Sequence, residues 1–523
     1  MKSTSTLPLE TSHRPTSTRL FGAWLGAMIT LVLASPALPD DVDPATSTIY
    51  IEAVTRQPQY TEPWRRSAPE TSSGTGFVVE AAFDGPTARY ILTANHVVQY
   101  ADAITVYLPE PHGQHPARLV VASPEFDLAL LELERGDQLQ KIAPLPIAPV
   151  PPVVEQDIRV FGYPIGGADQ SVTSGIVSRI ETAWTDYDRL ALRVQIDAAL
   201  NPGNSGGPAV GHGRVLGLAY QVNDEAENIG YLVPSVEITR FLQDVADGAY
   251  DRPAHLQVFW QSVIHDAQRR ALRVPDNQTG VWVRNVRELP AGHPHATQLR
   301  PNDVITAIGS ANISNEGLAP LYPGITGRFE YLADRYAFQG KVPLTVYRNG
   351  QRLTVQEPAP NRPPRLVPWL MNEPPPYYIY GPIVFTRASR ELYYLVGDGF
   401  RPILGLYGSP LMTRFVDWKE HDEHELVAVA SAYFPHGSTR GLEDPTFNII
   451  QSINGKPVKN LAELVRTLEA SDDEFLEIVF ADSYSDRAVF DRRVISTATE
   501  SILDDNGIRH RASSGLRPLL KNP

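Results

Sequence analysis

Residues 201–208, Asn-Pro-Gly-Asn-Ser-Gly-Gly-Pro, constrain this chain more than any other stretch. Glycine adopts backbone conformations that other residues avoid, so Gly203 lets its own N–H and that of Ser205 point into one small space. Two N–H groups in that arrangement can stabilise an oxyanion. The glycines after Ser205 leave room for a carbonyl group beside its hydroxyl. The stretch therefore predicts a nucleophilic serine, provided that a base elsewhere in the chain can take its proton.

A base and a carboxylate are both present. An apolar run at 91–94 leads into a small-residue turn that carries His96, and Asp127 begins an alternating segment at 127–133. Taken alone, the serine could lie in a plain loop, the histidine in a structural turn and the aspartate at a strand end. Together they have the His, Asp, Ser chain order of the chymotrypsin-type triad, which differs from the order in subtilisins and α/β-hydrolases. We therefore predict that His96 is the general base, Asp127 its orienting partner and Ser205 the nucleophile.

Four segments carry a resemblance to a known family. They are Ser-Gly-Thr-Gly-Phe-Val-Val at 73–79, Thr-Ala-Asn-His-Val-Val at 93–98, Asp-Leu-Ala-Leu-Leu at 127–131, and the stretch 201–208. They resemble the protease domain of the HtrA/Deg family of trypsin-like serine proteases. The resemblance implies a mainly β fold, a chymotrypsin-like pair of six-stranded barrels with the triad in the cleft between them. It also implies an oxyanion hole made by the N–H groups of Gly203 and Ser205.

The same resemblance implies where a substrate binds. The residue six positions before the nucleophile, at the base of the specificity pocket in this fold, is Ala199. Because alanine carries no charge, we expect a preference for Val, Ala or Leu rather than for Lys or Arg. We expect the strand at 215–220 to pair with the substrate backbone through Leu218, Ala219 and Tyr220, as in β-strand addition. Gly166-Gly167 and the segment 229–235 resemble the family's flexible loop and closing strand.

The 523-residue chain is long enough for two to four domains. After the protease domain, a strand near 279–286, a small-residue helix and Pro-x-Asp-Val-Ile at 301–305 resemble a PDZ domain. The expected carboxylate loop of that module, at 256–260, lacks glycine. The segments 377–381 and 448–458, with a helix at 460–469, resemble a second PDZ domain of the Deg branch best known from plants. We expect a signal peptide at 1–37, the protease domain at 45–248, a PDZ-like α+β domain at 253–357, a proline-rich linker at 358–376 and a second PDZ-like domain at 377–510.

The N-terminus and the composition indicate a compartment. Basic residues precede an apolar run at 20–34, and small residues follow at 35–37, a pattern typical of a secretory signal peptide. An uncleaved membrane anchor is the alternative. The chain has no cysteine, so it forms no disulfide and no thiolate metal site. Its net charge of −14 argues against a nucleic-acid partner. We expect a periplasmic or secreted protein.

The predicted chemistry needs no metal or organic cofactor. The cluster His-Asp-Glu-His-Glu at 421–425 has metal-ligand spacing, but we interpret it as a solvated loop, as we do the histidines at 112, 115, 293 and 295. The family resemblance implies unfolded or damaged envelope proteins as substrates, PDZ domains that regulate or recruit, and a homo-oligomer built from trimers. The competing hypothesis is a non-proteolytic, chaperone-like holder or PDZ scaffold whose triad is misaligned.

Overall fold

A computed structural model describes residues 42–83, 85–164, 169–220, 230–290, 292–483, 485 and 487–521. The predicted signal peptide, Gly166-Gly167 and Ile229 lie outside these residues. The described residues belong to one compact unit that begins at Val42. Within the described ranges, no helix is long and apolar enough to cross a membrane.

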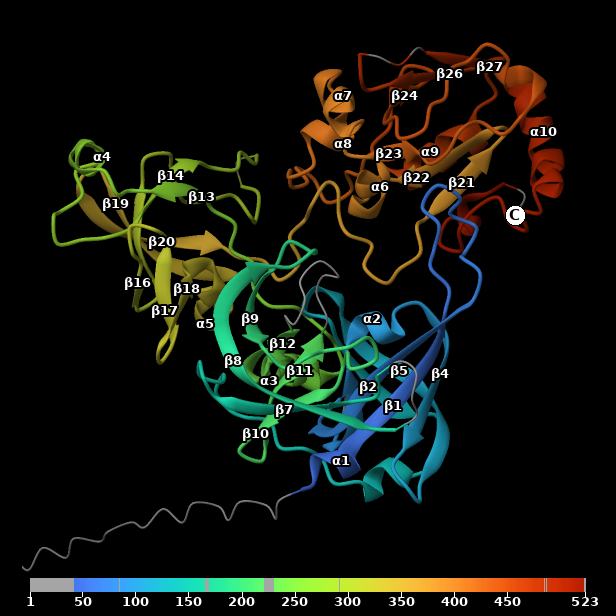
Figure 1. Cartoon of the computed structure of the whole chain (residues 1–523). Coiled ribbons are helices and arrows are strands. Elements are labelled where there is room, and N and C mark those ends of the chain that lie inside the picture. The colour runs from blue at the N-terminus through green and yellow to red at the C-terminus, as the bar shows by residue number, and fades with distance from the viewer. Residues whose placement is uncertain are drawn as a thin grey trace, which may run out of the picture. The chain divides into compact units, whose positions relative to one another are not determined.

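The first β-barrel has six antiparallel strands (blue and cyan in Figure 1). They are β1 (Thr48–Thr55), β2 (Glu70–Ala81), β3 (Ala88–Thr93), β4 (Ala101–Leu108), β5 (Gly113–Ser123) and β6 (Leu128–Leu133), and they close in the order β1-β2-β3-β6-β5-β4. The helix α1 (Pro44–Ser47) precedes β1, and α2 (Asn95–Val98) follows β3. Strands β2 and β3 pair as an antiparallel hairpin.

The second β-barrel closes in the order β10-β11-β12-β9-β8-β7. Its strands are β7 (Asp157–Gly162), β8 (Ser171–Trp184), β9 (Leu190–Ile196), β10 (Pro208–Gly211), β11 (Arg214–Tyr220) and β12 (Gly230–Pro234). The proline-containing segment 148–153 leads from the first barrel to the second, and the helix α3 (Ser235–Asp244) follows β12. Two closed six-stranded barrels confirm the predicted chymotrypsin-like fold.

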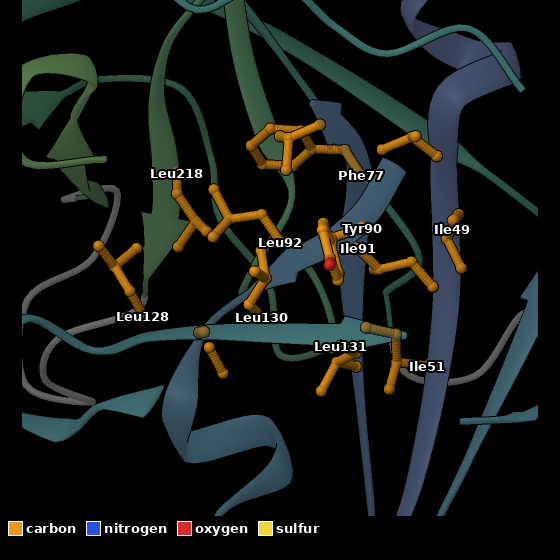
Figure 2. Close-up of a cluster of buried hydrophobic side chains, with 14 of the residues drawn as sticks. Ile49, Ile51, Phe77, Tyr90, Ile91, Leu92, Leu128, Leu130, Leu131 and Leu218 are labelled. Carbon is orange, nitrogen blue, oxygen red and sulfur yellow. The ribbon is translucent and has the colours of Figure 1, made fainter. Parts of the chain in front are cut away.

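The core of the first barrel continues into the second. Alternating residues of the first-barrel strands, such as Ile49, Ile51 and Leu130, are completely buried. The same cluster contains Leu218 of β11 and Phe241 of α3 (Figure 2). Each buried side chain of this size contributes about 1.5–3 kcal/mol. The apolar contact therefore fixes the two barrels against each other as well as closing each one.

The region after the two barrels forms an open six-stranded sheet. Its strand order is β13-β14-β15-β19-β20, and β16 pairs with β15. Its strands are β13 (Phe259–Ser262), β14 (Val281–Asn285), β15 (Val304–Ile308), β16 (Ala311–Asn312), β19 (Lys341–Arg348) and β20 (Gln351–Pro358). Beside them lie the hairpin β17 (Leu318–Tyr322)–β18 (Ile325–Arg328) and the helices α4 (Asp266–Ala271) and α5 (Ala333–Tyr336). Asn349 and Gly350 turn the β19–β20 hairpin with φ of 52° and 82°, as the Asn-Gly pair predicts.

One expectation for this region is wrong. The sequence predicts a small-residue helix between β14 and β15, but the described residues at 286–290 and 292–299 contain none. Pro290 and Pro294 each remove a backbone N–H, and Gly292 has a φ of 84°, far from helical values. Three helix-breaking residues within five positions outweigh the helix propensity of the alanines.

The C-terminal region contains two sheets and a helical insertion. The first sheet is β21 (Tyr377–Tyr380), β22 (Ile383–Arg387) and β23 (Val427–Val429), and the second has the order β25-β24-β26-β27. The second sheet's strands are β24 (Ile450–Ile453), β25 (Lys456–Pro457), β26 (Phe475–Phe480) and β27 (Ala488–Asp491). Helices α6 (Arg390–Leu395), α7 (Arg401–Leu406) and α8 (Pro410–Thr413) lie between β22 and β23 in the chain, and α10 (Arg492–Asp505) follows β27. The predicted helix is present as α9 (Leu461–Ala470), where the Asn460 side chain accepts from the Glu463 N–H at 2.8 Å.

The proline-rich segment at 358–376 packs against its neighbours along its length. Leu366, Val367 and Leu370 are buried, and the Leu366 N–H donates to the Asp417 carbonyl at 3.0 Å. Proline fixes φ, so the segment is stiff, as its composition predicts. The apolar residues between the prolines are what bury it.

Candidate active site

His96 and Asp127 meet at one end of the first barrel. His96 lies in α2, and Asp127 follows the 3-10 turn Pro124–Phe126 with a left-handed backbone, φ 58° and ψ 45°. One Asp127 carboxylate oxygen accepts the His96 backbone N–H at 2.9 Å, and the other lies 2.7 Å from the ring Nδ1. The two contacts hold the ring in one orientation, with Nδ1 as the donor and Nε2 free to accept a proton.

The carboxylate also changes the acidity of the histidine. Burial lowers the pKa of His96, but the charge of Asp127 and its hydrogen bond raise that pKa more, so the result lies above the ordinary value of 6.5. The protonated imidazole is therefore stabilised by its neighbour. A base of this kind can take a hydroxyl proton and hold it during a reaction.

Ser205 lies on a loop of the second barrel that Thr75 of the first barrel holds. The Thr75 N–H donates to the Ser205 carbonyl at 2.8 Å, and its hydroxyl donates to the Gly203 carbonyl at 2.7 Å. The same hydroxyl oxygen accepts the Tyr163 N–H at 3.0 Å. Thr75 is completely buried, so these bonds are shielded from water. The loop that carries Ser205, the predicted nucleophile, is thus fixed relative to the barrel that carries His96.

The loop around Ser205 presents unused backbone donors. Gly203 and Gly206 have φ of 101° and 88°, in the region that glycine alone enters freely. Among the described residues, the N–H groups of Gly203 and Ser205 donate to no acceptor. The Gly206 N–H instead donates to the Ala219 carbonyl at 2.7 Å. These two free N–H groups are the donors that the sequence predicts for an oxyanion hole.

His96 and Ser205 make no hydrogen bond to each other in the described structure. Ser205 is 8% exposed, while the His96 side chain is 46% exposed. Bonds between a nucleophile and its base are often long without substrate and shorten when substrate binds. In the described structure the contact between His96 and Asp127 is therefore formed, while His96 and Ser205 are not hydrogen-bonded.

A cleft of about 590 Å³ begins at His96 and Asp127 and extends along the end of the β8–β9 hairpin. We call it the His96 cleft. Its other lining residues come from both barrels and are Asn95, Gln99, Pro124, Glu125, Glu181, Ala183, Trp184, Thr185, Asp186, Tyr187, Arg193, Tyr220 and Tyr231. Its aromatic walls and charged groups suit a peptide side chain.

The four candidate substrate residues have different surroundings. Leu218 pairs with Pro208 on one side and Val233 on the other, and its side chain is in the core. Ala219 is also paired on both sides, because its N–H donates to the Gly207 carbonyl at 2.8 Å and β12 takes the other edge. These two residues offer no edge for a substrate strand. Tyr220 borders the His96 cleft, and Ala199 is exposed just before the nucleophile loop.

Two residues near the site escaped the sequence reasoning. Thr75 stands inside the matched segment 73–79, where only its position in the fold reveals that it holds the nucleophile loop. Arg193 looks like any strand arginine in the sequence, and only its burial and its place in the His96 cleft distinguish it. No sequence pattern signals either role, because both depend on contacts between distant segments.

The histidine and carboxylate clusters in the sequence do not assemble into a metal site where the structure can be described. In the described ranges, no group of three or more His, Cys, Asp or Glu side chains is placed to hold a metal ion. The rings of His421 and His424 pack edge to face at 4.8 Å. This contact is that of two neighbouring side chains in a loop.

Comparisons with known proteins agree with this geometry. A family model for the trypsin-like peptidase domain matches residues 74–218, and one for the PDZ domain matches residues 368–515. The protein "Protease Do-like 2, chloroplastic" of Arabidopsis thaliana is 30% identical over 488 residues, which cover 92% of this chain and 77% of that protein. The chain belongs to the Deg/HtrA family of Do-like proteases. It is therefore a serine protease of the trypsin-like class.

One further relative is bacterial, and one similar protein has a solved structure. A "Probable periplasmic serine endoprotease DegP-like" of Marinomonas sp. is 31% identical over 320 residues, covering 58% of this chain and 61% of that protein. The solved structure "HtrA-type protease AlgW with tripeptide" is 24% identical and has a TM-score of 0.46, covering 61% of this chain and 95% of that one. The relatives thus include both organellar and periplasmic proteases.

Proposed function

We propose that this Deg/HtrA protease is an endopeptidase that works through an acyl-enzyme on Ser205. His96 Nε2 takes the hydroxyl proton as Ser205 Oγ attacks the substrate carbonyl, and the same proton then passes to the leaving amine. Asp127 holds the imidazole and stabilises its protonated form. Water, activated by His96, then hydrolyses the ester. The observation that carries this proposal is the pair of contacts that His96 makes to the Asp127 carboxylate, through its backbone N–H at 2.9 Å and its Nδ1 at 2.7 Å.

The oxyanion hole completes the proposed mechanism. The N–H groups of Gly203 and Ser205 would bind the negative oxygen of the tetrahedral intermediate. One such donor contributes about 2.7–4 kcal/mol to transition-state stabilisation in related chemistry. Ala199, which carries no charge, would allow Val, Ala or Leu before the scissile bond.

The biological setting belongs to the proposal as well. We infer that the substrates are unfolded or damaged proteins of the cell envelope, since an extended chain is needed to reach a recessed serine. The periplasmic relative and the signal-peptide pattern at 1–37 support export. We infer a protease domain at 45–248 and PDZ-like domains at 253–357 and 377–510 that recruit substrates or regulate cleavage. A homo-oligomer built from trimers is the assembly we expect.

Degradation of casein tests the proposal. Purified wild-type chain is expected to cleave casein after small apolar residues, and Ser205→Ala is expected to retain the fold and lose cleavage. Removing one member of a triad typically costs about 10⁴–10⁶-fold in rate. A serine-directed phosphonate should label the wild type at Ser205 and leave Ser205→Ala unlabelled. Cleavage by Ser205→Ala at the wild-type rate would overturn the assignment.

A further inference from the structure

Arg193 is a buried cation that has no acidic partner among the described residues. It lies in β9, is 7% exposed and lines the His96 cleft. Its guanidinium stacks over the Tyr220 ring, 4.9 Å from the centroid, and donates to the Leu192 carbonyl at 3.4 Å. Among the described residues, no carboxylate lies within ion-pair distance of it. The Tyr220 side chain is also a hydrogen-bond partner of Arg193, so the described contacts of this guanidinium are to uncharged groups.

Two other buried arginines in the described ranges contact acceptors of this chain. Arg390 pairs with Asp188, and Arg189 donates to the carbonyls of Pro253 and Asn361 at 3.3 and 2.6 Å. A buried charge without a partner is costly, so proteins normally supply one. The partners of Arg193 among the described residues are uncharged, the Leu192 carbonyl and the Tyr220 side chain, and Arg193 faces a cavity that is large enough for a ligand.

Three of the four acids that line the cleft in the described structure are already engaged. Glu181 is the cross-strand neighbour of Arg193, yet it pairs with Arg179 at 2.7 Å. Glu125 pairs with Arg252 at 3.5 Å. Asp127 holds His96, and Asp186 is exposed in the turn between β8 and β9. Within the described ranges, the charge of Arg193 is therefore open to a substrate carboxylate.

We propose that Arg193 forms a subsite for an acidic side chain of the substrate, close to the scissile bond. A charge-assisted bond to Asp or Glu would satisfy the guanidinium, and Tyr187 and Tyr220 would pack against the side chain's methylenes. This inference rests on the proposed function, because the cleft begins at His96. An extended substrate places alternate side chains on the same side. The rate of cleavage should therefore depend on the charge of the substrate side chain at one position, or at two positions that lie two residues apart.

A scan with fluorogenic peptides tests the subsite. One peptide of the preferred sequence carries Glu, or its uncharged counterpart Gln, at each of three positions on either side of the scissile bond. The readout is the Glu-to-Gln ratio of kcat/KM, which is internal to each variant. At the responding position we expect a ratio of about five or more for the wild type, and about one for Arg193→Gln.

Two variants control this measurement. Arg193→Lys keeps the charge and should keep most of the preference for Glu, which a purely structural role would not predict. Arg118→Gln removes a surface arginine of the first barrel, 64% exposed and paired with Glu132, and should leave the ratio unchanged. The preference should also weaken as salt is raised.

Binding of the same peptides to the full-length Ser205→Ala chain separates the two proposals. Fluorescence anisotropy should show tighter binding of the Glu peptide, and Arg193→Gln in the same background should remove the difference. Equal cleavage and equal binding of both peptides at every position would overturn the subsite. A preference that survives Arg193→Gln would also overturn it. Absence of any cleavage would count against the proposed function, while the binding comparison would still decide the subsite.

Discussion

At the residue scale, the bond between His96 and Asp127 governs the proton chemistry. Activity needs neutral His96, and Asp127 raises the pKa of that ring above 6.5 by its charge and hydrogen bond. Activity should therefore fall as the pH drops through a value above 6.5. The Asp127 carboxylate therefore makes His96 a stronger base, and it also lowers the activity of the protein in acid.

Asp127→Asn tests this coupling. Without the carboxylate charge, burial is left to lower the pKa of His96, so the acid limb of kcat/KM should move below pH 6.5. The rate should fall by about 10⁴-fold, because the amide favours the wrong tautomer. A pH–rate profile with a small peptide substrate gives both quantities. An acid limb at the wild-type pH in the variant would show that Asp127 does not set the pKa.

Sequence reasoning at this scale succeeded where a residue type implies its chemistry. A serine between glycines, a turn histidine and an aspartate suggested a site, and the structure brings His96 and Asp127 into contact. Arg193 could not be found in that way, because its unusual property is burial in three dimensions without an acidic partner among the described residues. The sequence also does not show that Leu218 and Ala219 are paired with other strands on both sides. The neighbours of a strand are set by barrel closure, which the sequence pattern does not reveal.

At the element scale, the turn that carries Ser205 depends on Gly206. A Cβ at this position would collide with the Thr75 carbonyl oxygen and the Thr93 hydroxyl, and would lie 2.9 Å from the Ala94 nitrogen. Gly206→Ala should therefore lower the free energy of unfolding by more than about 2 kcal/mol and remove phosphonate labelling of Ser205. Denaturant unfolding and labelling of the purified chain measure the two effects.

Gly136→Ala is the matched control for this turn. Gly136 has a φ of 87°, almost equal to the 88° of Gly206, but nothing lies within 4 Å of its would-be Cβ. The control isolates the backbone penalty of about 1–2 kcal/mol from the collision. If both variants lose the same free energy of unfolding, the collisions at Gly206 contribute nothing beyond the backbone penalty.

Strands were predicted more reliably than the helix between β14 and β15. The β2–β3 and β19–β20 hairpins have alternating residues and turn residues at the right positions, and both are present. The expected helix does not form because Pro290 and Pro294 each remove a backbone N–H that a helix would use. Local breakers are decisive in short segments, where few hydrogen bonds are available to oppose them.

At the scale of the whole molecule, a buried ion pair ties the first barrel to the segment that follows the second. Glu125, completely buried beside Asp127, pairs with Arg252 at 3.5 Å. Arg252→Met should leave an uncompensated buried carboxylate and destabilise the chain by about 3–5 kcal/mol. Adding Glu125→Gln should restore part of that stability, because the charge is gone. Denaturant unfolding of the single and double variants completes the cycle, and strictly additive losses would contradict a coupled pair.

The bridge made by Thr75 has a consequence for engineering. His96 and Asp127 stand in one barrel and Ser205 in the other, and Thr75 secures the loop of the second barrel from a strand of the first. Cutting the chain at 148–153 would give two fragments, each with the strands of a complete barrel and neither with a complete set of reacting groups. Each fragment would be silent alone, and joining them would restore Thr75's hold on the serine. The chain is thus a natural starting point for a split reporter whose signal marks the encounter of two fused proteins.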